Sequence, residues 1–336
     1  MSGSSSPSAM REGEAGEVTR LAPSPTGALH LGNARTFLVN FALARQRKWR
    51  IVLRIEDLDT PRNKAGADRD ALEALEWLGI SWDEGPIYQS RDLEPYRTAL
   101  AKLAARALAY PSELSRTEIE AAASAPQADS GEAGREIVFP AYLRPALIAR
   151  TLEDADIEKN WRFVTPPDTV EFEDAFAGHQ RHEPARSIGD FVIWTKRGQP
   201  AYQLAVVVDD HRQGITQVVR GDDLLDSTAR QILLYQALGM KPIPAWRHLP
   251  LVVGPDGRRL AKRHGDSRIA TYRARGVRRE RIVGLLAKWC GMTGAGGVAQ
   301  EMSTEEFVER FEADRMPREK AVFGAHDEAW LLSRGR

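Results

Sequence analysis

Two strand-helix units follow one another near the start of the chain, and they limit the possible fold more than any other feature. Residues 18–22 form a short apolar stretch of β type, and after the turn-rich segment 23–27 a helical period runs through 37–44. A second strand is predicted over 49–55 and a second helix around 72–79. This order predicts a parallel sheet with helical crossovers, whose ligand crevice lies beyond the carboxyl ends of the strands.

The same pattern returns later in the chain after an interruption. Residues 113–137 are rich in Ala, Ser, Gly and Glu, a composition that indicates an insertion rather than another β-α unit. A strand is then predicted over 214–219, a long amphipathic helix over 224–238 that is closed by Gly239, and a strand over 248–253. We therefore expect an α/β core in two halves with an inserted subdomain.

This reading divides the 336 residues into five segments. They are a disordered tail (1–16), the first half of the core (17–110), the insertion subdomain (111–185), the second half of the core (186–253), and a loop with a helical C-terminal subdomain (254–336). The tail is rich in Ser, Gly and charge, so it buries too little apolar surface to offset the entropy of ordering.

Composition restricts the partners and the compartment. Lys+Arg and Asp+Glu are equal at 47 each, so a polyanion such as tRNA must bind to a local basic surface. The single cysteine, Cys290, cannot form an internal disulfide and is too few for a thiolate zinc site. No apolar run approaches the roughly 20 residues that span a bilayer. We expect a cytoplasmic monomer with no membrane partner.

A first chemical motif is the tetrapeptide HLGN at 30–33, where a strand loop enters a helix. Backbone amides and the helix dipole can face a phosphate there, Gly32 permits close approach, and His30 is a candidate donor. The alternative is structural, with Gly32 serving a turn and Asn33 capping the helix.

A second motif is the basic run RLAKR at 259–263, which follows the turn signal GPDG at 254–257. Its Lys262 suits neutralising charge that develops on an α-phosphate and on leaving pyrophosphate. The alternative is an ordinary solvated surface turn.

The octapeptide RLAPSPTG at 20–27, directly before His30, resembles the start of the class I glutamyl-tRNA synthetases. The HIGH-type motif of that family corresponds to HLGN, and its KMSKS-type motif to RLAKR, with Ala261 in place of a small hydroxyl residue. Further matching segments are 54–57, 201–205, 208–211 and 219–224. The resemblance covers roughly residues 18–265 and implies a Rossmann-like class I aminoacyl-tRNA synthetase catalytic core.

The resemblance also implies roles for individual residues. His30 and Lys262 would be catalytic; ATP would be bound by His30, Gly32, Asn33 and Lys262; and glutamate by Arg20, Ala22, Ser24, Glu56, Tyr202 and Arg220. The implied reaction is in-line attack of the glutamate carboxylate on the α-phosphate of ATP, which needs no protein nucleophile. Mg²⁺ would accompany ATP as part of the substrate, held mainly by phosphate oxygens and water.

The chemistry of glutamate agrees with this pocket. Its two carboxylates call for guanidinium forks, which Arg20 and Arg220 can supply, and its ammonium calls for an acidic partner such as Glu56. The alternative for each arginine is an ordinary surface ion pair.

Within the family, the resemblance is closest to the short paralogues, the glutamyl-queuosine tRNA(Asp) synthetases, because a longer synthetase would continue past Arg336 into a helical anticodon-binding region. The segment 202–211 (YQLAVVVDDH) also resembles that subgroup. Such an enzyme transfers glutamate to queuosine at the wobble position of tRNA(Asp). Two alternatives remain: a truncated glutamyl-tRNA synthetase that charges tRNA(Glu), and a catalytically silent tRNA-binding paralogue.

The insertion departs from the short paralogues, which often carry a zinc knuckle. At those positions this chain has Ser112, Leu114, Phe139 and Leu143, none of which replaces a thiolate. We therefore predict no structural zinc and an insertion packed by apolar contacts. A final set of residues could touch tRNA phosphates, although a solvated helix face is the alternative: Arg273, Arg275, Arg278, Arg279 and Arg281.

Overall fold

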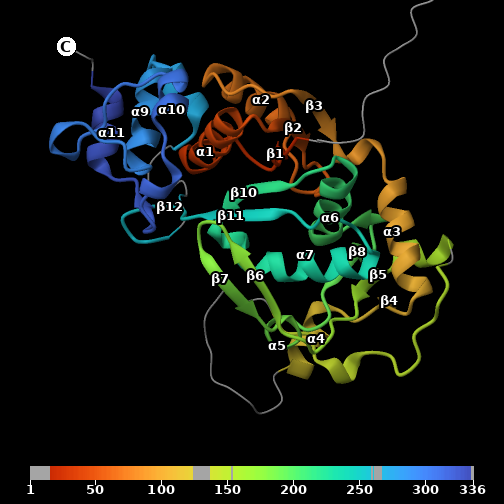
Figure 1. The fold of residues 1–336 in the computed structure, drawn as a ribbon. Coiled ribbons are helices and arrows are strands. Elements are labelled where there is room, and N and C mark those ends of the chain that lie inside the picture. Colours follow the sequence, from red (N-terminus) through yellow and green to blue (C-terminus); the bar gives the residue numbers. More distant parts are fainter. Residues whose placement is uncertain (1–15, 124–136, 153, 259, 261–266, 334–336) are drawn as a thin grey trace, which may run out of the picture.

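A sheet with helices on both faces forms the centre of the computed structural model, which describes residues 16–123, 137–152, 154–258, 260 and 267–333 (Figure 1). Within these ranges the sheet has seven strands in the order β3-β2-β1-β10-β11-β6-β7. Neighbouring strands are parallel except for β6 and β7. The strands are β1 (Val18–Leu21), β2 (Arg50–Ile55), β3 (Glu84–Tyr88), β6 (Val170–Asp174), β7 (Gly178–His182), β10 (Gln217–Gly221) and β11 (Ala245–Leu249). The predicted α/β class is confirmed.

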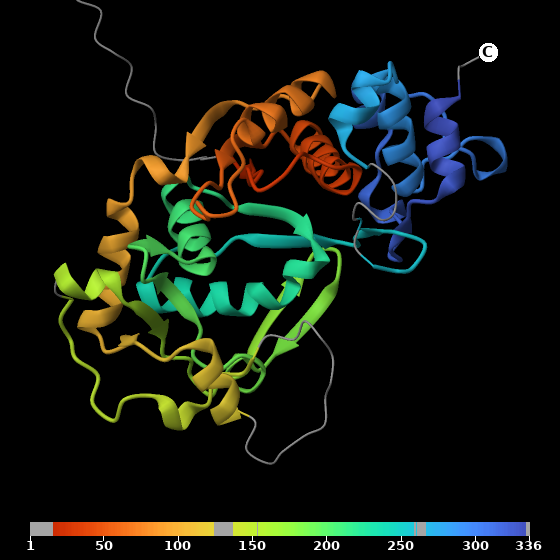
Figure 2. The ribbon, with the colours of Figure 1, turned by 180° about the vertical axis from the view of Figure 1, so that it is seen from behind.

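Helices cover both faces because successive strand side chains point to opposite sides. Leu53 and Val219 belong to one buried apolar cluster with α1, whereas Val52 and Val218 belong to another with α3, α6 and α7. Figures 1 and 2 show these two helical layers from opposite sides. The helices are α1 (Leu31–Arg47), α2 (Ala67–Trp77), α3 (Glu94–Ala105), α6 (Tyr202–Arg212) and α7 (Leu225–Leu238).

The strand order reverses between β1 and β10, and this reversal determines where a ligand can bind. From β1 the chain continues outward to β2 and β3, whereas β10 lies on the other side of β1 and is followed by β11. The helices that follow β1 and β10, α1 and α7, belong to different apolar clusters, so the two connections diverge at the carboxyl ends of these strands. Open α/β sheets bind ligands at such a point.

A second, antiparallel sheet divides the chain differently from the segments expected from sequence. Within the part of the chain described, it has the order β4-β5-β8-β9. Its elements and the short helices beside it are β4 (Ala109–Ser112), α4 (Arg116–Ala123), β5 (Asn160–Phe163), α5 (Pro184–Ser187), β8 (Val192–Thr195) and β9 (Gln199–Pro200). Thus β8 and β9, from segment 186–253, join the smaller sheet, while β6 and β7, from segment 111–185, join the large one. The paired Trp161 and Trp194, both fully buried, explain why β5 and β8 stay together.

An apolar cluster lies in the insertion, around three of the four positions that the resemblance relates to a zinc knuckle. Tyr110, Ile119 and Phe139 are buried there, with Leu114 and Leu143 packed against them. The apolar packing predicted for the insertion is therefore present. Among the described residues, no group of three or more His, Cys, Asp or Glu side chains is arranged to hold a metal ion.

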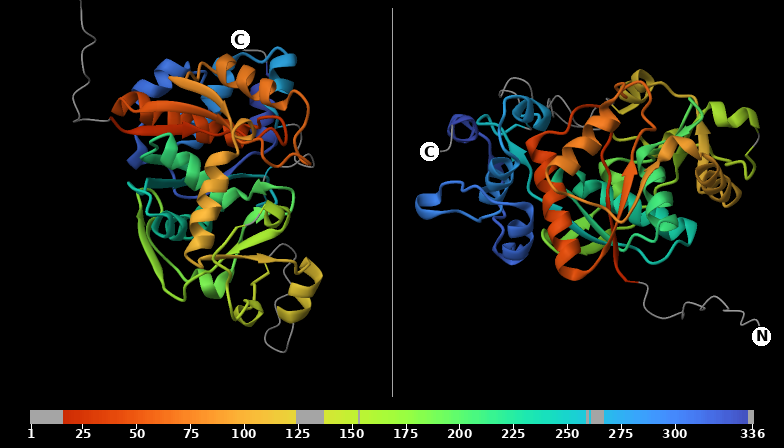
Figure 3. Two further views of the ribbon diagram at one scale, coloured as in Figure 1. Left: turned by 90° about the vertical axis from the view of Figure 1, so that its right-hand side faces the viewer. Right: turned by 90° about the horizontal axis from the view of Figure 1, so that it is seen from above.

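The C-terminal region is helical and packs beside α1 (Figure 3). Its elements are β12 (Val252–Val253), α8 (Ile269–Ala274), α9 (Arg279–Trp289), α10 (Thr304–Arg310), β13 (Ala321–Val322) and α11 (Ala325–Leu332). β12 and β13 pair in parallel, which ties this region to the strand that leaves the large sheet. Over the ranges given above, no helix is long and apolar enough to cross a membrane.

One arginine proposed for tRNA contact is not on a solvated face. The Arg281 side chain is only 7% exposed; it pairs with Glu301, donates to Ser333 and stacks over the ring of Trp330. Arg281 therefore holds α9 to neighbouring segments, and the expectation of a uniformly solvated helix face is wrong at this position. Arg278, by contrast, is largely exposed and pairs with Glu301 at the surface.

Candidate active site

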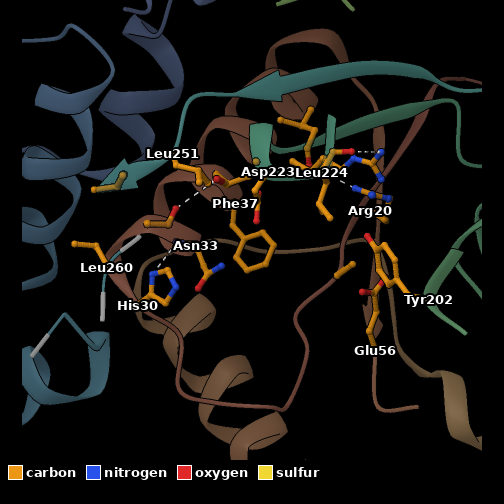
Figure 4. A pocket seen from close by; sticks show the side chains of 17 residues that line it. Arg20, His30, Asn33, Phe37, Glu56, Tyr202, Asp223, Leu224, Leu251 and Leu260 are labelled. Carbon is orange, nitrogen blue, oxygen red and sulfur yellow. Dashed lines mark hydrogen bonds between the residues drawn. The ribbon is translucent and has the colours of Figure 1, made fainter. Parts of the chain in front are cut away.

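A crevice opens at the carboxyl ends of β1, β2 and β10, where the strand order reverses (Figure 4). It brings together eight of the residues predicted from sequence, namely Arg20, Ala22, His30, Gly32, Asn33, Glu56, Tyr202 and Arg220. Ser24 is exposed and is not among the lining residues. Lys262 lies outside the described residues. The crevice has two chemically distinct ends.

The first end is formed by the start of α1. His30 is the N-cap of this helix, and its Nδ1 accepts the backbone N–H of Asn33 at 3.4 Å. The N-cap is thus His30. The alternative interpretation of this motif, in which Asn33 caps the helix, is wrong. Because Nδ1 acts as an acceptor, the neutral ring carries its proton on Nε2. A Cβ on Gly32 would lie 3.2 Å from two atoms of this ring, so glycine lets the imidazole lie against the helix.

Both sides of the basic loop reach the same end of the crevice. On one side, Leu260 lines the crevice with His30. On the other, Leu31 N–H donates to Ser267 O (2.9 Å) and Ile269 N–H donates to Leu29 O (3.0 Å). The segments that flank residues 261–266 are therefore fixed beside the α1 N-terminus. Of the loop itself, Arg259, Ala261, Lys262 and Arg263 lie outside the described residues.

The second end contains Arg20, Glu56 and Tyr202, which Figure 4 shows grouped away from His30. Arg20 is buried on β1, and its Nε lies 3.4 Å from Asp210 Oδ1. Its Nη1 donates weakly to Val219 O at 3.5 Å. Glu56 directly follows β2, so its carboxylate stands beside Arg20 at the ends of adjacent strands. This end pairs a cation with an anion, as a zwitterionic ligand requires.

A buried ion cluster supports the second end from below. The guanidinium of Arg54 is fully buried; its Nη1 donates to Asp210 (2.7 Å) and Gln213 (2.8 Å), and its Nη2 donates to Glu56 (3.1 Å). Burial by itself would lower the pKa of Arg54, but Asp210, Glu56 and Asp209 outweigh it and raise the pKa. The guanidinium thus stays charged and fixes the Glu56 carboxylate.

Glu56 itself is held in an environment that resists ionisation. Burial raises the pKa of its carboxyl above 4.5, while Arg54 and Arg20 act in the opposite direction. Sequence reasoning missed the supporting role of Arg54 and Asp210, although both were part of matched segments. The sequence signal that could have shown this role was a charged residue in an element with an apolar run, as Arg54 is in β2 and Asp210 is in α6.

Arg220 is the most heavily bonded residue of the crevice. Its Nε donates to His248 (2.9 Å), its Nη1 to Gln231 (2.9 Å), and its Nη2 to Thr228 (2.8 Å) and Leu224 O (3.3 Å). A guanidinium has five N–H groups, so these contacts with described residues leave one, on Nη1. Arg220 therefore offers a ligand one directed donor rather than the two-pronged fork expected from sequence.

Other crevice residues were not predicted from sequence. Phe37 lies between the two ends in Figure 4, and Asp223 follows β10 at the rim. A Cβ on Gly221 would lie 2.5 Å from Asp223 Oδ1, so this glycine lets the acidic side chain fold back over the strand end. The signal available for Asp223 was its place directly after the strand that carries Arg220.

A second, wider cavity adjoins this crevice. It lies between α6, α7 and the smaller sheet, with a volume of about 830 Å³ against about 180 Å³ for the crevice. Tyr202 lines both. Tyr202 thus lies at the boundary between the wider cavity and the end of the crevice that contains Arg20 and Glu56.

Comparison with known proteins places this geometry in a family. Residues 17–330 match the catalytic domain of the class I tRNA synthetases (E and Q). A Glutamyl-Q tRNA(Asp) synthetase of Symbiobacterium thermophilum is 45% identical over 327 residues, which cover 93% of this chain and 97% of the relative. One from Rhodopirellula baltica is 43% identical over 318 residues, 91% of this chain and 96% of the relative.

Longer relatives share the same core. A Glutamate--tRNA ligase of Burkholderia cenocepacia is 38% identical over 316 residues, 93% of this chain but 65% of the relative. Among solved structures, a glutamate tRNA ligase from Elizabethkingia meningosepticum in complex with its amino acid has a TM-score of 0.75 at 27% identity, over 94% of this chain and 68% of that one. Together with the crevice at the strand reversal, these matches show that the chain belongs to the class I tRNA synthetases of the E and Q family.

Proposed function

We propose that this protein activates L-glutamate with ATP to glutamyl-adenylate and transfers the glutamate to queuosine at the wobble position of tRNA(Asp). The observation that carries the proposal is the match to Glutamyl-Q tRNA(Asp) synthetases along 96–97% of their length, with the crevice residues in place. The Glutamate--tRNA ligases match over a smaller share of their own length and at lower identity.

Glutamate fits the second end of the crevice. In the proposed complex its ammonium lies against the Glu56 carboxylate, with Tyr202 and Ala22 as the adjoining wall. Arg20 and the remaining N–H of Arg220 bind the carboxylates. Two buried guanidinium groups on adjacent strands favour an amino acid with two carboxylates, one on the main chain and one on the side chain. They disfavour an amino acid whose side chain ends in a neutral amide.

ATP fits the first end. In the first turn of α1 the N–H groups of Leu31 and Asn33 already donate to Ser267 O and His30 Nδ1, so the N–H of Gly32 and the positive end of the helix dipole face its phosphates, with His30 beside them. ATP enters as its Mg²⁺ complex, and Lys262 neutralises the charge that develops on the α-phosphate and on pyrophosphate. The carboxylate attacks in line, so the protein acts by positioning and by charge.

The wider cavity supports an approach for the acceptor nucleoside. In this proposal a nucleoside in the wider cavity meets the activated carboxyl group beside Tyr202, which lines both cavities, on the side away from the ATP end. Sequence-specific readers of RNA take unstacked bases from single-stranded loops, which suits a wobble nucleoside.

A transfer assay tests the acceptor. Labelled glutamate, ATP and the enzyme are incubated with tRNA(Asp) that contains queuosine, with tRNA(Asp) that lacks it, and with tRNA(Glu). We expect label only on the queuosine-containing tRNA. Label on tRNA(Glu) alone would show that the protein is a shortened glutamyl-tRNA synthetase instead.

Exchange of labelled pyrophosphate into ATP separates an enzyme from a catalytically silent paralogue. We expect exchange with glutamate and little with glutamine or aspartate. Complete absence of exchange, with and without tRNA, would favour the silent alternative.

A further inference from the structure

A buried carboxylate-imidazole pair stands behind Arg220, on the side away from the crevice. Asp174 is the last residue of β6 and His248 lies on the adjacent strand β11. Their side chains are both fully buried, and Asp174 Oδ2 lies 2.6 Å from His248 Nδ1. Neither residue lines the crevice. Neither residue takes part in the reaction proposed above.

The backbone around Asp174 fixes which oxygen meets the imidazole. Oδ1 accepts the N–H groups of Phe176 (2.9 Å) and Ala177 (2.7 Å), and both oxygens share the backbone N–H of His248 at 3.2 Å. Oδ2 is the oxygen that faces Nδ1 of His248. A carboxylate at this distance accepts a proton-bearing nitrogen, so Nδ1 carries the hydrogen. Burial lowers the pKa of His248, against the opposing effect of Asp174, and this favours the neutral ring. Its Nε2 then carries no hydrogen and can only accept a hydrogen bond, through its lone pair.

That lone pair points at Arg220. Arg220 Nε donates to His248 Nε2 at 2.9 Å, and the Thr228 hydroxyl lies 3.2 Å from the same nitrogen. The same hydroxyl accepts Arg220 Nη2–H at 2.8 Å, so it can donate its own hydrogen to Nε2. The bond from Arg220 Nε–H requires an unprotonated Nε2, because a guanidinium can only donate. With a hydrogen on that nitrogen, two donors would face each other in a buried site.

We infer that Asp174 and His248 are positioning residues for amino-acid binding: Asp174 holds His248 in its Nδ1–H form, and His248 orients Arg220 so that its one uncommitted N–H faces the crevice. The inference rests on the proposed function to the extent that Arg220 binds a glutamate carboxylate. It adds two residues, 74 positions apart, to the determinants of glutamate affinity.

Asp174→Asn is the sharpest variant because it is nearly isosteric. Its Oδ1 keeps the two backbone N–H donors, so the new amide nitrogen takes the place of Oδ2 and faces His248 Nδ1. His248 is then driven to carry its hydrogen on Nε2, opposite Arg220 Nε–H. In the pyrophosphate exchange assay we expect the KM for glutamate to rise about ten- to a hundredfold. The KM for ATP should stay within about threefold of the native value.

Two substitutions of His248 separate orientation from folding. His248→Gln keeps an acceptor near the position of Nε2, whereas His248→Asn keeps a donor near Nδ1 and removes the acceptor. We expect His248→Gln to retain a glutamate KM closer to native than His248→Asn does. Glu173→Gln is the matched control, since Glu173 pairs with His179 at 2.7 Å in the same hairpin but at the surface. It should leave both KM values unchanged.

A spectroscopic measurement tests the arrangement without any substrate. With ¹⁵N-labelled histidine, the His248 signals, assigned by their loss in His248→Asn, should show hydrogen on Nδ1 and none on Nε2. Asp174→Asn should invert this. A native Nε2 that carries hydrogen would overturn the inference, as would a glutamate KM unchanged by Asp174→Asn or an equal rise in the KM for ATP. If the native enzyme shows no glutamate-dependent exchange, the proposed function fails, while the spectra still decide the state of His248.

Discussion

At the scale of single residues, the crevice contains side chains that differ in how far the protein already occupies their bonding groups. Arg220 is bonded along most of its guanidinium, and Glu56 is held by Arg54. His30 uses Nδ1 to cap its own helix. Side chains held in this way need less ordering when substrate binds.

Sequence reasoning identified eight of the residues that line the crevice but not the residues that support them. Glu56 follows a strand, Arg220 lies near the end of one and His30 precedes a helix, so local pattern and family resemblance were enough to find them. Asp174 and Arg54 act through partners far away in the sequence, and no local pattern reveals a contact between positions 174 and 248. The role of Lys262 stays a prediction.

Lys262→Ala should lower the rate of adenylate formation more than it weakens glutamate binding, because its charge matters most as phosphate charge develops. We expect a loss of about a hundredfold or more in kcat of glutamate-dependent exchange. The KM for glutamate should change by less than about threefold. Lys102→Ala, an exposed site on α3, is the control. Equal effects on kcat and KM would contradict this role.

The raised pKa of Glu56 makes glutamate binding depend on pH. Burial raises this pKa above 4.5, so protonation begins to remove the partner of the substrate ammonium at a higher pH than for an ordinary glutamate. The KM for glutamate should therefore rise as pH falls toward that raised value. The corresponding contribution of Glu56 to folding stability has the opposite sense: it is full below pH 4.5 and is lost as pH rises through the raised pKa.

Glu56→Gln provides the control for this pH effect. Its KM for glutamate should be high throughout and should lack the acidic rise, because an amide does not titrate. A native KM that is flat over the acidic range, or a variant that keeps the same rise, would exclude Glu56 as the ammonium partner.

At the scale of elements, the individual strands and helices were easier to predict than their partners. The predicted strands at 18–22 and 49–55 correspond to β1 and β2, and the predicted helix at 224–238, closed by Gly239, corresponds to α7. The exchange of β6–β7 and β8–β9 between the two sheets was missed. An alternating apolar pattern reports which face of a strand is buried but not which sheet buries it.

Gly284→Ala should destabilise the C-terminal helices, although alanine normally favours a helix by about 1 kcal/mol over glycine. A Cβ at this position of α9 would lie 1.8 Å from Gln300 O, a backbone atom that cannot turn aside. We expect a net loss of about 1–3 kcal/mol in the free energy of unfolding, measured by urea titration. Gly27→Ala, where a Cβ meets no atom within 4 Å, should change it little. An unchanged urea midpoint for Gly284→Ala would show that α9 does not pack as described.

At the scale of the whole molecule, the account depends on one crevice shared by segments far apart in the chain. β1, β2 and β10 supply the glutamate end, and the start of α1 supplies the phosphate end. Leu260 and the backbone bonds of Ser267 and Ile269 bring the flanks of the basic loop to that phosphate end. The C-terminal helices pack against α1, so they also hold the loop flanks in register with His30.

A crystal structure with a non-hydrolysable glutamyl-adenylate analogue would test this account most directly. We predict that its amino group lies against Glu56, its side-chain carboxylate against Arg20 or Arg220, and its phosphate beside His30 at the start of α1, with Lys262 reaching the same phosphate. An analogue bound elsewhere, or bound with Glu56 and His30 on opposite sides of a wall and no shared cavity, would contradict it.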